Sequence, residues 1–200
     1  MYKLAKYSVA LVLGLVLAAS ANANLIVNGS FEDNDVAEGT WQYFAADDVN
    51  GWDGSNIEIW DGLNGVASAV GEQHAELNAH PYAGEFSIFQ NFATVVGQSY
   101  DVSFFYSARQ SNAESFAYSV GSLMGELTDH VVGTWSQFQG SFIASSEMSQ
   151  IRFTSITNGT VGNFLDGVVV AASVPEPGSL VLLALGLFGL GFARKSIARS

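Results

Sequence analysis

The chain between Leu25 and Val170 is patterned as many short strands. Runs rich in β-branched and aromatic residues recur there between clusters of Gly, Asn, Asp and Ser, and no stretch has a convincing helical pattern. We expect strands at residues 25–27, 41–44, 57–60, 74–78, 86–92, 100–108, 116–120, 131–132, 135–143, 150–155 and 164–170. Short strands at such spacing are typical of a sandwich or barrel, so the sequence predicts an all-β, antiparallel β-sandwich.

Alternation and turn residues add detail to this pattern. In the run 57–60 the two isoleucines share one face, and the glutamate and the tryptophan share the other, because side chains alternate along a strand. Gly97 and Gln98 mark a turn between the apolar runs 88–96 and 100–106. The turn predicts that these two runs are antiparallel neighbours.

The N-terminus has the composition of an export signal. Lys3 and Lys6 precede an apolar run over residues 9–19, and the small-x-small sequence Ala21-Asn22-Ala23 follows. The run is short for a membrane span. We therefore predict a helical signal peptide of residues 1–23 that signal peptidase removes after Ala23. An uncleaved anchor helix is the alternative.

The C-terminus carries a second apolar segment behind a structure-breaking motif. Two prolines and a glycine interrupt residues 174–178, residues 180–193 are apolar, and residues 194–200 contain Arg194, Lys195 and Arg199. Fourteen residues of helix span about 21 Å, less than the roughly 30 Å hydrocarbon core of a bilayer. A hydrophobic helix of this length suits a transient membrane association, although a plain anchor helix with its basic end in the cytoplasm is the alternative.

This order of elements resembles the PEP-CTERM sorting signal of Gram-negative bacteria. The resemblance implies that Pro175, Glu176 and Pro177 form the recognition element of an exosortase, a membrane-bound processing enzyme. It also implies an exported protein of the cell envelope, outer surface or extracellular matrix, in a bacterium that makes exopolysaccharide and biofilm. The ligand of the domain between the two ends does not follow from it.

The segment between the two ends, residues 24–173, is acidic and free of cysteine. Of the chain's 19 acidic and 7 basic residues, all the acids except Glu176 lie in it, but only Arg109 and Arg152 among the bases. Such a charge repels nucleic acid and anionic lipid. About 150 residues suffice for one domain with one core, and no disulfide can support it.

Fragments along this domain resemble galactose-binding-like jelly rolls, including carbohydrate-binding modules of families 4, 9 and 22 and plant DUF642 cell-wall proteins. The fragments are Asn24–Glu32 (NLIVNGSFE), Gly51-Trp52, Ile57–Trp60, Ala75–Asn78, Phe89-Gln90, Gly97–Tyr100, Trp135 with Phe138, and Phe164–Val170. Their order covers essentially the whole domain. The resemblance implies that the first and last strands lie side by side, often with a structural Ca²⁺ between them. Glu32 and Asp166 would be its side-chain ligands, although Gly167 stands where the family usually has a second Asp.

The sequence His74–His80 (HAELNAH) is the sharpest local pattern. Ala75 and Leu77 can point inward while His74, Glu76 and Asn78 point to the other face, and Pro81 indicates that the strand ends before His80. Imidazole and carboxylate together suit a transition metal. We favour the simpler interpretation, in which this is the polar face of an exposed strand.

Aromatic residues suggest a carbohydrate ligand. An exposed aromatic ring can stack on a sugar ring while polar groups bind its hydroxyls. The candidate sugar-binding residues are Trp41, Tyr43, Trp52, Glu58, Trp60, Tyr82 and Arg109. We assign Trp135 to the core. The alternative for the other aromatic residues is that they pack in the core or at its rim.

No motif indicates catalysis. The chain lacks a Gly-x-Ser-x-Gly elbow, a His-Glu-x-x-His zinc motif, a phosphate-binding loop and cysteine. Its many carboxylates alone do not identify a glycosidase pair. We therefore expect a non-catalytic, exported module that binds polysaccharide. The alternatives are a structural matrix or adhesion protein without sugar specificity and, third, an exopolysaccharide hydrolase.

Overall fold

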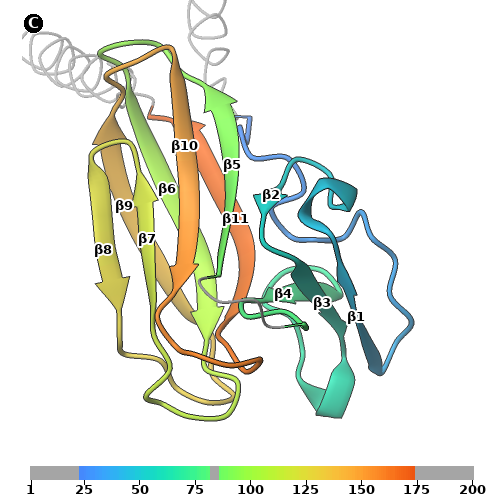
Figure 1. Ribbon diagram of the computed structural model, residues 1–200. Helices are drawn as coiled ribbons and strands as arrows, with labels where there is room; N and C mark the ends of the chain where they lie inside the picture. The colour runs from blue at the N-terminus through green and yellow to red at the C-terminus, as the bar shows by residue number, and fades with distance from the viewer. Residues whose placement is uncertain (1–22, 82–85, 174–200) are drawn as a thin grey trace, which may run out of the picture. The chain divides into compact units, whose positions relative to one another are not determined.

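The computed structural model describes residues 23–81 and 86–173 (Figure 1). Residues Ala23–Ser173 form one compact unit. Residues 1–22 of the predicted signal peptide, Tyr82 and the tail with Pro175, Glu176 and Pro177 lie outside the described residues. Within these residues there is no helix with the length and apolar character to cross a bilayer.

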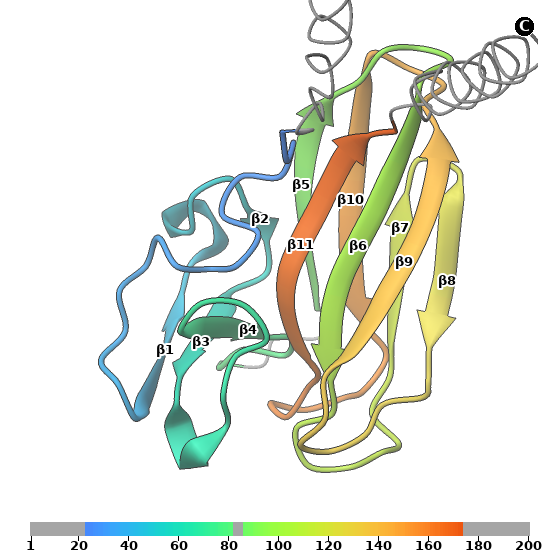
Figure 2. The ribbon, with the colours of Figure 1, turned by 180° about the vertical axis from the view of Figure 1, so that it is seen from behind.

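Two sheets pack face to face to form a sandwich (Figures 1 and 2). Sheet A has the strand order β1-β3-β4-β11-β6-β9, and sheet B has the order β2-β5-β10-β7-β8. Every pair of neighbouring strands is antiparallel. The strands are β1 (Thr40–Phe44), β2 (Asp53–Gly54), β3 (Ile57–Asp61), β4 (Gln73–Glu76), β5 (Ser87–Ala93), β6 (Ser99–Ser107), β7 (Phe116–Val120), β8 (Leu123–Leu127), β9 (Ser136–Ile143), β10 (Met148–Ser155) and β11 (Phe164–Ala172), with 3₁₀ turns at Ala46–Asp48 and Leu63–Gly65.

The core between the sheets is built from the inward face of each strand. Ile57 and Ile59 on β3 belong to it, as the alternation predicts. Phe104 on β6 stacks on Phe138 at 4.8 Å between ring centroids and meets Phe153 of sheet B edge-on at 4.9 Å. Aromatic pairs in these geometries contribute beyond their buried area, which suits a domain without disulfides.

The strand pattern of the sequence is largely confirmed. Nine predicted runs coincide with strands, and their ends agree within two residues. The prediction fails at residues 25–27, which form no strand, and at residues 131–132, which form only isolated bridges. It also misses β2 and β8. Strand β8 (LMGEL) is short and carries a glycine, which weakens its signal.

The predicted pairing of the runs on either side of Gly97 is wrong. Strand β5 pairs with β2 and β10 in sheet B, whereas β6 pairs with β9 and β11 in sheet A. The turn carries the chain from one sheet to the other instead of closing a hairpin. Turn residues mark a reversal of the chain but do not identify the strand that receives the hydrogen bonds.

The first and last segments of the domain lie side by side, as the jelly-roll resemblance implies. The Leu25 amide donates to the Val170 carbonyl, and the Val168 amide donates to the Gly29 carbonyl. A β-carbon on Gly29 would lie 2.1 Å from the Val168 carbonyl oxygen, so this close approach requires a glycine. The chain therefore enters and leaves the domain along the same strand, β11.

Candidate functional site

One row of side chains crosses the outer face of sheet A, away from the core. Tyr43 on β1 lies opposite Glu58 on β3, and Glu58 lies opposite Glu76 on β4. Directly opposed residues of antiparallel strands point to the same side of the sheet. The register therefore places two predicted sugar-binding residues next to a carboxyl group that was not among them.

A second row runs parallel to the first on the same face. Trp41 lies opposite Trp60, and Trp60 lies opposite His74. We call the outer surface formed by these two rows of β1, β3 and β4 the aromatic face. It collects Trp41, Tyr43, Glu58 and Trp60 from the predicted set.

Exposure divides the aromatic face into a rim and a floor. Trp41 and Tyr43 on the edge strand β1 are 42% and 44% exposed, whereas Glu58, Trp60, His74 and Glu76 are buried. Two rings two residues apart on one strand project to the same side, about 7 Å apart along the backbone. The two exposed rings form the rim and can meet a ligand. The four buried residues, Glu58, Trp60, His74 and Glu76, form the floor that supports them.

Arg109 covers the floor from the loop after β6. Its Nη1 donates to both carboxylate oxygens of Glu76, at 2.7 and 2.9 Å, and its guanidinium carbon lies 4.7 Å from the Trp60 ring centroid. The Arg109 side chain is 23% exposed and the Glu76 side chain is fully buried. Arg109 therefore joins the predicted set at this face, through hydrogen bonds to the carboxyl group of Glu76 and a cation–π contact with Trp60.

The two carboxyl groups of the floor are held differently. Glu58 accepts a 2.8 Å hydrogen bond from the indole Nε1 of Trp60. Glu76 accepts from the Gly162 amide as well as from Arg109. Burial, with a smaller contribution from Glu58, raises the pKa of Glu76 to about 9, against the opposing effect of Gly162 and Arg109.

His74 is buried among aromatic rings, which corrects the prediction that residues 74–78 form an exposed polar face. Its ring lies 4.6 Å from Phe164 and 5.4 Å from Trp135, and its Nδ1 bonds the Ser68 hydroxyl at 2.9 Å. Its Nε2 has no hydrogen-bond partner among the described residues. Burial lowers the pKa of His74 to about 4, so the ring is neutral. Trp135, assigned to the core from the sequence, is half-buried on this outer side.

Trp52 does not belong to the aromatic face. It is buried, stacks on Phe31 at 5.2 Å, and donates from Nε1 to the Asn28 carbonyl at 3.0 Å. No exposed side of this ring is left for a sugar. Its position in the sequence does not separate it from Trp41, because both follow turn residues and lie in polar surroundings.

The predicted calcium ligands, Glu32 and Asp166, hold one loop through backbone amides. Glu32 Oε1 accepts from Glu72 and Gln73, each at 3.0 Å. Asp166 accepts from the Val70 amide at 2.8 Å, and burial raises the pKa of its carboxyl group to about 7.

A calcium ion needs six to eight oxygen ligands, yet the groups that face these two carboxylates are N–H donors. Across residues 23–81 and 86–173 no group of three or more His, Asp or Glu residues is placed to hold a metal ion. Calcium binding stays a prediction, which the melting temperature with and without calcium can check.

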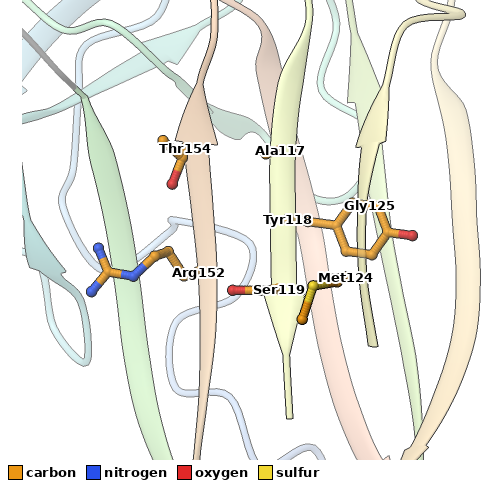
Figure 3. Close-up of a pocket in the computed structure, with 7 residues that line it drawn as sticks. All are labelled: Ala117, Tyr118, Ser119, Met124, Gly125, Arg152 and Thr154. Atoms are coloured by element: carbon orange, nitrogen blue, oxygen red, sulfur yellow. The ribbon is translucent and has the colours of Figure 1, made fainter. Parts of the chain in front are cut away.

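A shallow hollow of about 340 Å³ lies on the opposite sheet (Figure 3). Residues of β7, β8 and β10 line it: Ala117, Tyr118, Ser119, Met124, Gly125, Arg152 and Thr154. Its one charged group is Arg152. The guanidinium carbon of Arg152 lies 4.2 Å from the Phe89 ring centroid, and its Nη1 donates to the Ser87 hydroxyl at 2.7 Å. This guanidinium is therefore engaged within the sheet, and none of the predicted residues lies here.

Comparison with known protein families identifies a motif at the C-terminal end of the chain. The model of the PEP-CTERM protein-sorting motif matches residues 173–195. The chain carries a PEP-CTERM sorting motif. No curated protein sequence matches the chain.

Several solved structures share the sandwich architecture. One is the arabinose-bound α-L-arabinofuranosidase MgGH51, with a TM-score of 0.52 and 10% identity over 78% of this chain and 27% of that one. Others are the module TmCBM61 in complex with β-1,4-galactotriose (TM-score 0.49, 16% identity, 76% and 99% covered) and the CBM22-1 xylan-binding domain of Xyn10C from Paenibacillus barcinonensis (0.47, 13%, 80% and 100%). At these identities the likeness to the arabinofuranosidase shows the fold and nothing of the ligand.

The sequence-based prediction did not include Glu76 as the partner of Arg109. It also did not predict that the residues of the floor pack together. A signal was present, because the alternation of residues 74–78 places His74 and Glu76 on one face. The chain order did not show what covers that face, since Arg109 and Trp135 come from segments more than 30 residues away.

Proposed function

We propose that this protein is exported, is processed through its PEP-CTERM motif by an exosortase, and binds polysaccharide without catalysis at the aromatic face. One observation carries the binding proposal. Trp41 and Tyr43 project side by side from the edge strand β1 and keep almost half of their surface exposed. Large apolar rings kept in water at one place mark a binding surface more often than chance exposure does.

The buried floor supports this proposal because it makes the rim rigid. Glu58 lies opposite Tyr43 and is fixed by Trp60, which in turn lies opposite Trp41. A binding surface whose supporting residues are locked by hydrogen bonds loses little conformational freedom when the ligand arrives. Arg109 completes the floor, and its side chain is 23% exposed.

The floor does not suit hydrolysis. A glycosidase needs two carboxyl groups that flank the scissile bond. Glu58 and Glu76 are buried and bonded to Trp60, Arg109 and Gly162, so neither meets a substrate in this arrangement. We therefore assign them a supporting role.

The second candidate, a structural matrix or adhesion protein without sugar specificity, has one observation in its favour. Trp52 and Trp60 are both buried and serve packing, which leaves Trp41 as the exposed tryptophan of the three proposed for sugar binding. The two candidates differ in a single property, the binding of a defined glycan.

A glycan array with the purified mature chain separates them. The array is run with calcium and again with chelator, so that a calcium requirement would be seen. We expect binding to at least one class of polysaccharide, and loss of that binding when Trp41→Ala and Tyr43→Ala are combined. Absence of binding under both conditions would favour the structural role.

A further inference from the structure

The end of the sandwich where β5 passes to β6 exposes a group of large apolar side chains. Val95 and Val96 lie in that connection, Ile143 ends β9, and Met148 begins β10; their exposed fractions lie between 59% and 67%. We call these four residues the apolar tip. Exposed aliphatic residues are ordinary when single, but a group on adjacent loops marks an interaction surface.

Hydrogen bonds tie the two loops of the tip together. The Thr94 amide donates to the Glu147 carbonyl, and the Gly97 amide donates to the Ala144 carbonyl, at 2.9 and 2.8 Å. The Thr94 hydroxyl also donates to the Ser146 carbonyl at 2.8 Å. The tip is therefore a fixed part of the sandwich, and its four apolar side chains point to solvent.

The described domain ends at this same tip. The Ser173 amide donates to the Ser99 carbonyl at 2.9 Å, and the side chain of Gln98 donates to the Ser173 carbonyl. Figures 1 and 2 both show the end of β11 beside the β5–β6 connection. The apolar segment 180–193 begins seven residues after Ser173, a distance that an extended chain covers within about 25 Å.

We propose that the apolar tip is a membrane-contacting surface, which rests against the lipid bilayer while the tail is in the membrane. This inference rests on the proposed sorting of the tail and is independent of the sugar ligand. The two loops carry one charged residue, Glu147, and no basic one. The contact is therefore apolar, and it does not depend on anionic lipid as a basic patch would.

A second copy of the chain fits the tip less well than a bilayer does. Four side chains bury a few hundred Å² at most, whereas a stable protein interface buries above about 1,000 Å². A bilayer can bind a small apolar surface, because the tail of the protein already holds the domain near the membrane and raises the effective concentration of the tip there.

The absence of cysteine makes a direct test possible. A Val96→Cys variant of residues 24–200, which keeps the tail, is labelled with an environment-sensitive fluorophore and mixed with phosphatidylcholine vesicles. The matched control is Ile156→Cys, an exposed aliphatic residue just past the other end of β10. Flotation of the same samples reports whether the tail binds vesicles at all.

We expect the label at position 96 to brighten at least twofold with vesicles and to be quenched by brominated lipid, while the label at position 156 stays unchanged. Replacing a third of the lipid by phosphatidylglycerol should not increase the effect. If the chain floats with the vesicles but the labels at positions 96 and 156 both stay in water, the proposal is overturned and the sorting role is left intact. Failure to float would contradict membrane association through the tail itself. A label at position 96 that is shielded before vesicles are added would assign the tip to its own chain or to a second copy, and would also overturn the proposal.

Discussion

At the scale of single residues, two tryptophans of similar sequence surroundings have opposite roles. Trp52 packs between Phe31 and Phe153, and its indole nitrogen bonds a backbone carbonyl. Trp41 lies on an edge strand with much of its ring in water. Their identity as tryptophan is visible in the sequence, whereas their burial is decided by neighbours that are distant along the chain.

The two substitutions to alanine should therefore separate stability from binding. Trp52→Ala removes a buried ring and a hydrogen bond, and we expect it to lower the free energy of unfolding by about 3–5 kcal/mol. Trp41→Ala should change it by less than about 0.5 kcal/mol, because the ring is an exposed one on an edge strand. Urea denaturation of both variants checks this, and equal losses would contradict the burial difference.

At the scale of elements, strand β4 shows where sequence patterns succeed and where they stop. The alternation of residues 74–78 correctly places His74 and Glu76 on one side. The prediction that this side faces water is wrong, because Arg109 and Trp135 cover it. Periodicity finds the faces of a strand, but only the tertiary arrangement decides which faces are covered.

The predicted pairing of β5 with β6 is wrong for a related reason. The turn between them is correctly located at Gly97, yet it joins two sheets. The local sequence fixes where the chain bends, while the hydrogen-bonding partners of β5 and β6 come from β10 and β11, at the far end of the chain.

The buried carboxyl group of β4 should make stability depend on pH. Folding raises the pKa of Glu76 from 4.5 to about 9, so the folded chain keeps a proton that the unfolded chain has lost in this range. The stabilisation is complete below pH 4.5 and is lost as the pH rises through about 9. Stability should therefore fall between pH 7.5 and 9, by at most about 1.4 kcal/mol per pH unit.

The control for this prediction is Glu76→Gln, which keeps an acceptor for Arg109 and Gly162 but carries no titrating proton. Its stability should be nearly flat over the same range. The window avoids His74 and Asp166, whose pKa values in the folded chain are about 4 and about 7. A native chain as flat as the variant would show that Glu76 is ionised in the folded domain at neutral pH.

At the scale of the whole molecule, the ends of the chain were easier to interpret than its middle. The order of a Pro-Glu-Pro motif, an apolar segment and basic residues is contiguous in the sequence, and the sorting-motif model matches it at residues 173–195. The binding surface is not contiguous. It is assembled from β1, β3, β4 and the loop after β6.

The sorting proposal predicts a processing defect when the motif is changed. Replacing Pro175, Glu176 and Pro177 with alanine should leave the export of the chain intact and block removal of its tail. Mass spectrometry of the protein from cells that contain an exosortase should then find the tail still attached. Normal processing of the variant would contradict the assignment of these residues as the recognition element.

The most direct measurement of the central claim is the affinity of the mature chain for a glycan selected on the array. Trp41→Ala is compared in the same titration with Met124→Ala, which removes an even more exposed apolar side chain from sheet B. We predict that Trp41→Ala weakens binding at least tenfold, a loss of about 1.4 kcal/mol or more, and that Met124→Ala leaves it unchanged. Equal affinities of the native chain and Trp41→Ala would contradict the aromatic face as the binding site.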